Sequence, residues 1–407
     1  LLMADRSPPA VFSPPPAGPR TTTSSSRVDN LGVCGCERGE VQRDLGKVVG
    51  ALEQRGLVTH ELSVATEASP LGVTFDGRRH FIALTPKRYW RVVQASKYAL
   101  SRRAMPGWAW EVLLGHFTFC ALVRRDLLSG FHTIYKFIRR HYNERVPLWD
   151  SAREEVRHFL GALVFARTDW TIQWSPHITA TDASLCGCGI CAATWPREEV
   201  ARAGRVPERS RFRSGHGEQP GARESFFAAN AELFDLAAMD LPCADELHED
   251  PEDPDFPELD ARLLAKSYFT PRASGRFCLP EDILILEARA LTRGLEVSIA
   301  VSKLANARVL MLVDNMSVCV SYERRRARNW PVLLRIRKLA SYCLAFNLQC
   351  HFRWIASEAN VADEPSRRFD AQYQRRLASS VCGVDTLPLP EPESGIFTGY
   401  LAPRHGS

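Results

Sequence analysis

The sequence predicts an α/β fold in which a mixed β-sheet is flanked by helices. Two short strands are expected at His177 to Ala183 and Ile190 to Trp195, where Gly187 and Gly189 would permit a tight turn. The run Arg308 to Val313 (RVLMLV) is typical of a strand buried inside a sheet. Helices are expected before and after this strand, at Glu281 to Ala300 and at Pro331 to Phe346. A further strand at Leu348 to Ile355 and a short helix near Asp363 complete the order.

The part of the chain before residue 171 has a different pattern. Residues 1–26 are rich in Pro, Ser and Thr, and this composition predicts a disordered segment. Val41 to Leu57 has apolar residues at helical spacing. Leu71 to Leu84 is predicted to form strand, turn and strand with Asp76-Gly77 at the turn. Residues 86–142 are expected to be largely helical, and Glu154 to Phe165 adds another short helix.

Composition excludes several classes of protein. The 407 residues are enough for two or three domains, and 45% of them are hydrophobic, as in a globular protein. No run of 18 apolar residues predicts a membrane span, and no secretory signal is evident, so we expect an intracellular protein, cytoplasmic or nuclear. The twelve cysteines are scattered without two separated pairs at zinc-ligand spacing, which favours reduced structural thiols.

Charge is distributed unevenly although the net charge is only +5. Between Arg78 and Arg145 there are fourteen Lys or Arg and three acids, and aromatic residues stand among them, which suits a nucleic-acid backbone. The residues expected to bind nucleic acid are Lys87, Arg88, Arg102, Arg103, Arg124, Arg125, Lys136, Arg139 and Arg140. Between Asp245 and Asp260 there are nine acids and no Lys or Arg, which indicates a solvated loop within an insertion expected at 196–278.

Glu287 has an unusual position on its predicted helix. Its neighbours three and four residues away are Ile283, Leu284, Ala290 and Leu291, so the carboxylate is expected on the buried face. A buried carboxylate without a partner is costly, and no Lys or Arg stands at these positions to pair with it. A metal ion is one candidate for the compensating partner. A helix in a different register, with Glu287 exposed, is the alternative.

Three aspartates lie at the ends of predicted elements. Asp314 directly follows a buried strand, where ligand sites of α/β sheets gather, although it is also placed to cap the following helix. Asp182 lies inside a strand, where aspartate is disfavoured. Asp363 begins a predicted helix and, considered by itself, is best explained as a helix cap.

Taken together, the four carboxylates predict a metal centre. Clustered at one end of a sheet, they would bind two hard divalent cations, Mg²⁺ or Mn²⁺, and would repel one another without them. Two such ions can activate a water and stabilise the leaving oxygen in phosphodiester hydrolysis. We therefore expect Asp182, Glu287 and Asp314 to converge, although 132 residues separate the first from the last.

Four segments resemble the ribonuclease H domain of retroelement polyproteins of the DIRS or long-terminal-repeat type. They are Thr181-Asp182-Ala183-Ser184, Leu286-Glu287-Ala288, Val313-Asp314-Asn315 and Trp354 to Arg367 (WIASEANVADEPSR). The resemblance implies a ribonuclease H-like mixed sheet, two Mg²⁺ ions held by Asp182, Glu287, Asp314 and Asp363, and cleavage of the RNA strand of an RNA–DNA hybrid. The interval of 105 residues between Asp182 and Glu287 is longer than this pattern leads us to expect.

The resemblance extends upstream with less specific motifs. Arg27-Val28-Asp29-Asn30 is similar to the Tyr-x-Asp-Asp turn of a reverse transcriptase palm, with Arg27 in place of Tyr and Asn30 in place of the second Asp. An ordinary turn explains Asp29-Asn30 equally well. We therefore expect a degenerate polymerase motif, a truncated palm and no primer extension by this chain.

These observations predict five regions and two competing functions. The regions are 1–26, disordered; 27–85, a partial palm; 86–170, a basic helical thumb or connection; 171–370, the ribonuclease H-like domain with its insertion at 196–278; and 371–407, a tail. One hypothesis is a hybrid-cleaving nuclease, and the other is a catalytically dead, nucleic-acid-binding remnant of a decayed retroelement. A transposase or integrase of the same fold fits less well, because those enzymes place their glutamate last.

Overall fold

The computed structural model describes residues 2–3, 32–33, 35, 38–59, 62–212 and 253–370. Asp29 and Asn30, the tail at 371–407 and all of residues 1–26 except Leu2–Met3 lie outside the described residues. Leu2–Met3 form strand β1, which pairs with β2 (Gly32–Val33) and β3 (Ser63–Val64). Helix α1 follows at Arg38–Glu53, close to the range predicted from the apolar spacing.

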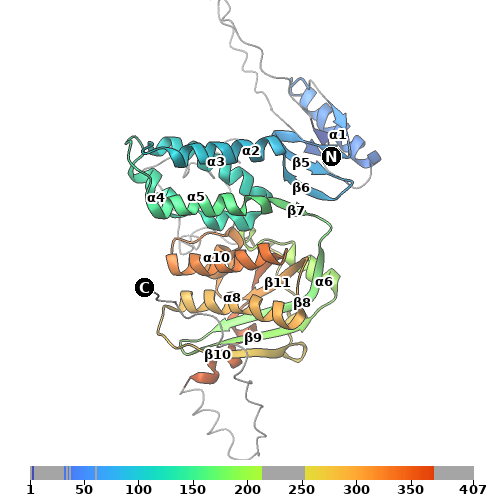
Figure 1. Ribbon diagram of the computed structural model, residues 1–407. Coiled ribbons are helices and arrows are strands. Elements are labelled where there is room, and N and C mark those ends of the chain that lie inside the picture. Colours follow the sequence, from blue (N-terminus) through green and yellow to red (C-terminus); the bar gives the residue numbers. More distant parts are fainter. Residues whose placement is uncertain are drawn as a thin grey trace, which may run out of the picture.

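A five-stranded mixed sheet forms the centre of the C-terminal half (Figure 1). Its spatial order is β10-β9-β8-β11-β12. The strands are β8 (Gln173–Ala183), β9 (Gly187–Thr194), β10 (Thr270–Arg276), β11 (Ala307–Val313) and β12 (Gln349–Trp354). The first three are joined by antiparallel pairing, whereas β8, β11 and β12 are parallel. The predicted mixed sheet flanked by helices is thus confirmed.

Helices cover both faces of this sheet. The side chains of β11 alternate between two cores, because Val309, Met311 and Val313 pack under one set of helices and Leu310 and Leu312 under the other. The first set is α8 (Ile283–Ser302), α9 (Met316–Arg324) and α10 (Trp330–Ala345), and the second is α6 (Arg197–Gly204). None of the helices within the described residues is both long and apolar enough to span a membrane.

The range 196–278, where we expect an insertion, contains regular elements in both of its described parts, 196–212 and 253–278. Its first part contains α6 and the short helix η4 (Glu208–Ser210), and its last part contains η6 (Ala261–Leu264), η7 (Lys266–Tyr268) and the edge strand β10. The sequence of β10, TPRASGR, has neither alternation nor a β-branched run. Its pairing with β9, and not local propensity, makes it a strand.

The N-terminal half contains a four-stranded antiparallel sheet and a helical layer. The strands are β4 (Glu67–Ala68), β5 (Val73–Asp76), β6 (Phe81–Leu84) and β7 (Arg167–Asp169), with η1 at Pro70–Gly72. The helices are α2 (Pro86–Ser101), α3 (Gly107–Val123), η2 (Arg125–Gly130), α4 (Thr133–Arg140), α5 (Asp150–Ala162) and η3 (Leu163–Phe165). Sheet and helices share one core, so the boundary predicted at residue 85 does not separate two packed units.

Buried charges join the two halves. The guanidinium of Arg124 donates to Asp126, to the carbonyls of Cys343 and Leu348, and to Asn347. Asp126 also accepts from Arg325 at 2.8 Å. Arg124 is almost fully buried, so the prediction that it binds nucleic acid is wrong; its guanidinium satisfies carbonyls at the end of α10 and the start of β12.

Candidate metal centre

Asp182 and Asp314 lie side by side at one edge of the central sheet. Thr181 of β8 is in register with Val313 of β11, so the next residue on each strand is an aspartate at the same carboxyl end. Carboxyl ends of parallel strands are where ligand sites of α/β sheets form. The parallel pairing therefore explains how residues 132 positions apart become neighbours.

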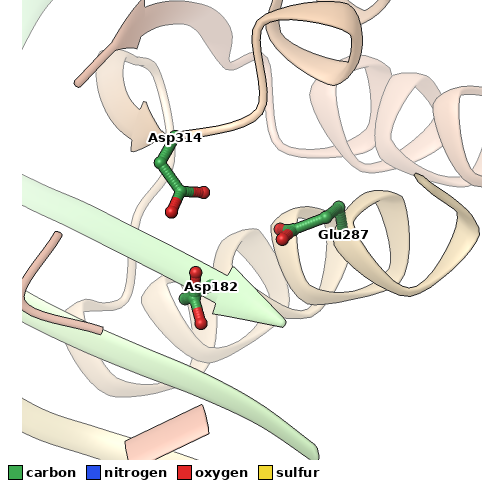
Figure 2. A group of neighbouring side chains, drawn as sticks. All are labelled: Asp182, Glu287 and Asp314. Carbon is green, nitrogen blue, oxygen red and sulfur yellow. The ribbon is translucent and has the colours of Figure 1, made fainter. Parts of the chain in front are cut away.

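Glu287 reaches the same place from helix α8 (Figure 2). The helix lies close to β8, because a Cβ at Gly294 would stand 2.4 Å from Thr181 Cγ2. A hydrogen bond of 2.6 Å between Ser298 and Thr179 holds the next turn. Glu287 lies two turns before Gly294 on the buried face, as the helical spacing predicted, and the residue is only 6% exposed.

The structure brings three of the four predicted acids together. Carboxylate oxygens of Asp182, Glu287 and Asp314 all lie within 4.8 Å of one another. In Figure 2 the three side chains point toward a common centre from a strand, a helix and a strand end. Their predicted convergence is confirmed, whereas their role as ligands stays a prediction.

The electrostatics of the group are unfavourable to negative charge. Burial, followed by the nearby Asp182 and Asp314 carboxylates, raises the pKa of Glu287 to about 9. Burial, followed by Asp314, raises the pKa of Asp182 to about 7. One oxygen of Glu287, Oε2, is buried without a hydrogen-bond partner, and no Lys or Arg of the described residues forms an ion pair with these three acids. When ionised, these carboxylates repel one another, and no ion pair of the described residues offsets that repulsion.

The alternative role of Asp314 as a helix cap is taken by its neighbour. The side chain of Asn315, not Asp314, accepts from the N–H of Val318 at 3.0 Å and caps α9. The backbone carbonyl of Asp314 accepts from the indole N–H of Trp354 at 2.8 Å. The Asp314 carboxylate is thus left for the acid cluster, while Trp354 fixes its backbone.

Asn360 is a functional candidate that the sequence reasoning did not single out. Its amide Nδ2 donates to Asp182 Oδ1 and to the carbonyl of Thr181, each at 3.2 Å, and its Oδ1 accepts from Ala362 N–H. The residue is 4% exposed. Asn360 therefore ties the loop before α11 to the Asp182 carboxylate, and its place in the Asn-x-Ala-Asp sequence was the available signal.

Gly187 and Gly189 have a different purpose from the one predicted. They lie inside β9, and the turn is formed by residues 184–186, with the Ser184 hydroxyl accepting from Gly187 N–H. A Cβ on Gly189 would stand 2.2 Å from the Ala362 carbonyl oxygen. The prediction of glycines for a tight turn was wrong, because they make room for the segment that carries Asp363.

Asp363 lies at the rim of the acid cluster and not within it. It is the first residue of α11 (Asp363–Ser366), whose cap position is Ala362, so it does not cap this helix. Its Oδ1 accepts from Arg367 Nε at 2.7 Å, and its side chain is 42% exposed. Its charge still contributes to raising the pKa of Asp182 and Glu287, which places it near them.

Most of the predicted basic residues remain available on the helical layer. Those with exposed side chains are Lys87, Arg102, Arg103, Arg125, Lys136 and Arg140. Arg88 and Arg139 are half-buried, and the Arg88 guanidinium stacks on the Phe119 ring at 4.4 Å. Buried Arg124 is excluded from this set. For the other residues, a cationic surface that binds nucleic acid stays a prediction.

No family model and no curated protein matches the sequence. Among solved structures, the chain is similar to the foamy viral protease-reverse transcriptase in complex with RNA/DNA hybrid (11% identity, TM-score 0.25) and with dsDNA (12%, 0.26). These alignments cover 86% and 81% of this chain and 59% and 54% of those chains. The chain therefore spans about half the length of the structures it matches.

Proposed function

We propose that the protein hydrolyses the RNA strand of RNA–DNA hybrids with divalent metal ions, as the ribonuclease H part of a retroelement reverse transcriptase. The observation that carries this proposal is the group of three carboxylates within 4.8 Å at the carboxyl end of β8 and β11. Two of them are buried, and the arginines that pair with other buried acids of this domain do not reach them.

The residues fit hard divalent cations. All donors are carboxylate oxygens, which Mg²⁺ and Mn²⁺ prefer, and the unpartnered Glu287 Oε2 lacks a cation or donor. Asp182, Glu287 and Asp314 would hold the ions, with Asp363 at the rim. When bound, such ions activate a water and stabilise charge on the leaving oxygen. Asn360 would keep Asp182 oriented, and Trp354 would keep the Asp314 backbone in place.

The substrate class follows from the resemblance of the motifs and from charge. Exposed cations on α2, α4 and their flanking loops suit phosphates on either strand of a hybrid duplex. Discrimination of RNA from DNA would depend on the 2′-hydroxyl and on helix shape. Polymerase activity is not part of this proposal, because Asn30 stands where the resemblance leads us to expect the second Asp of the polymerase motif.

Replacement of Asp314 by Asn tests the proposal. The change keeps the shape and leaves the α9 cap on Asn315. If Asp314 is a ligand, cleavage of a labelled hybrid in Mg²⁺ should fall by about 1,000-fold or more, since water activation and charge stabilisation are both weakened. Glu358→Gln, an exposed acid of the same domain, is the matched control and should cleave as the parent does.

The competing function is a nucleic-acid-binding remnant without catalysis. It predicts no cleavage by the parent in Mg²⁺ or Mn²⁺, together with salt-dependent binding of hybrid. Equal cleavage by the parent and Asp314→Asn would instead remove Asp314 from the site while leaving the nuclease itself in place. Nucleotide incorporation on a primed template, abolished by Asp29→Ala, would contradict the expectation that this chain does not extend primers.

A further inference from the structure

A hollow lies on the helical layer, and its residues are distant in sequence from the acid cluster. Its volume is about 670 Å³. It is formed by the end of α2, the loop to α3, the first turn of α3 and the segment after α4. Its lining residues are Tyr98, Arg102, Ala104, Met105, Pro106, Trp108, Ala109, Asn143 and Arg145.

Two aromatic side chains of this hollow are exposed to solvent. Tyr98 is 59% exposed and Trp108 is 50% exposed. Large rings bury readily and stabilise the protein when they do, so two exposed rings beside one hollow indicate a surface that binds something. The rings supply flat apolar faces beside the charged Arg102 and Arg145, while Met105 and Pro106 add further apolar surface to the hollow.

The position of Trp108 is fixed by backbone contacts. The N–H of Gly107 donates to the His141 carbonyl at 2.9 Å, and the N–H of Trp108 donates to the Tyr142 carbonyl at 3.0 Å. A Cβ on Gly107 would stand 2.7 Å from the Ile138 carbonyl oxygen, so glycine allows α3 to begin this close to α4. The hollow is therefore preformed, and a ligand would not have to order the loop.

The charge of the hollow is positive. Arg102 and Arg145 line it, and no acid is among the lining residues. The Arg102 guanidinium lies 4.1 Å from the centre of the Tyr98 ring and donates to its hydroxyl. Arg103, next to the hollow, is exposed as well. Asn143 adds an amide, which can both donate to and accept from a base edge.

We propose that this hollow binds an unpaired base of single-stranded nucleic acid. The base would stack on Trp108, its flanking phosphates would contact Arg145 and the Arg102 guanidinium that Tyr98 holds, and Asn143 would contact its edge. In a duplex the base faces are stacked on one another, so they are not free to stack on these exposed rings. This site extends the proposed function from a hybrid duplex to a strand leaving that duplex, and it does not depend on the acid cluster.

Binding of a labelled oligothymidylate and a labelled oligouridylate to the full chain tests this site. The measurements are made in EDTA, by fluorescence anisotropy and by quenching of tryptophan emission. Trp108→Ala should weaken single-strand binding by about tenfold, as expected for the loss of one stacked base, and Trp108→Phe should restore most of it. Tyr98→Ala should also weaken it, because the ring and hydroxyl that hold Arg102 are lost.

Trp90→Ala is the matched control. Trp90 belongs to the same helix as Tyr98 and is 57% exposed, but it does not line the hollow. This variant should bind single strands as the parent does, and Trp108→Ala should bind a blunt hybrid duplex nearly unchanged. Equal weakening by Trp90→Ala and Trp108→Ala, or equal loss for duplex and single strand, would overturn the proposal.

The outcome is separable from that of the proposed nuclease. Because EDTA removes divalent ions, single-strand binding is measured without cleavage. A chain that binds oligothymidylate through Trp108 yet never cleaves hybrid would contradict the nuclease and leave the stacking site. A chain that cleaves hybrid but shows no Trp108-dependent binding would do the reverse.

Discussion

The buried carboxylate of Glu208 and the buried carboxylates of the acid cluster lie in the same domain but have opposite surroundings. Glu208 is fully buried, and its oxygens accept from Arg353 Nε at 2.6 Å and Arg211 Nε at 3.0 Å. Asp182 and Glu287 are buried almost as completely, yet no arginine or lysine of the described residues pairs with them. Within the described residues, Glu208 therefore has counter-charges, whereas Asp182 and Glu287 have none in ion-pair contact. The first arrangement is that of a structural ion cluster, whereas the second offers carboxylate oxygens to a cation from outside, as the proposed function requires.

Glu208→Gln should give the largest loss of stability. It removes a carboxylate that pairs with both Arg353 and Arg211, of which Arg211 keeps Glu258 as a second partner. It also weakens the acceptor for the backbone N–H of Trp354. Breaking a buried pair by removing one partner costs about 3 to 5 kcal/mol. Urea denaturation of the parent and the variant measures the difference. If the free energy of unfolding falls by less than about 1 kcal/mol, the pairs of Glu208 with Arg353 and Arg211 contribute little to stability. Glu208 would then not differ from the acid cluster in this respect.

Divalent ions should stabilise the protein through the acid cluster alone. Mn²⁺ at about 100 times its dissociation constant would raise the free energy of unfolding by about 2.7 kcal/mol. Because bound carboxyls must lose their protons, the gain should be larger at pH 8 than at pH 6. Thermal melts with and without Mn²⁺ test this. Asp314→Asn should lose most of the gain, and an undiminished gain in that variant would place the ion elsewhere.

Glu287→Gln should change stability in the opposite direction to Glu208→Gln. The pKa of Glu287 rises from an ordinary value of 4.5 in the unfolded chain to about 9 in the folded protein. The folded state then binds more protons than the unfolded one, so its stability is full below pH 4.5 and falls as the pH rises toward 9. In EDTA at pH 8, we expect Glu287→Gln to be more stable than the parent by about 1 to 3 kcal/mol.

The check is the free energy of unfolding in urea at pH 5, 7 and 8.5 without metal. The difference between Glu287→Gln and the parent should be small at pH 5 and grow with pH. A constant difference, or a less stable variant at pH 8.5, would show that Glu287 is already neutralised by a partner within the chain.

The acid cluster could be predicted from the sequence, whereas its surroundings could not. Helical spacing placed Glu287 on a buried face, and the end of an apolar strand placed Asp314 at the carboxyl edge of the sheet. Both are local patterns. Strand β10 depends on pairing with β9, and the burial of Arg124 depends on carbonyls more than 200 residues away, which no local pattern contains. The sequence singled out Gly187 and Gly189 for a turn, but glycine is required there because Ala362 and Ser366 approach the β9 backbone closely.

Asp363 shares one property with Glu208 and another with the acid cluster. Of the changes discussed, its replacement by Asn should have the smallest effect in free energy. Like Glu208 it is paired with an arginine, because Arg367 Nε donates to Oδ1 at 2.7 Å; like the cluster acids it raises the pKa of Asp182 and Glu287. Since Arg367 and solvent already offset part of its charge, Asp363→Asn should slow hybrid cleavage by about tenfold, or about 1.4 kcal/mol of activation free energy.

Single-turnover cleavage of Asp363→Asn beside Asp314→Asn and Arg367→Ala decides which property matters. If Asp363 stays at the rim, Asp363→Asn should keep far more activity than Asp314→Asn. Arg367→Ala frees the carboxylate of Asp363 from its partner, so it should tighten the apparent affinity for Mn²⁺ by increasing the uncompensated negative charge. A loss for Asp363→Asn as large as that for Asp314→Asn would instead mean that Asp363 leaves Arg367 and binds the ion as a full ligand. The distinction between paired and unpaired acids would then hold only for the metal-free protein.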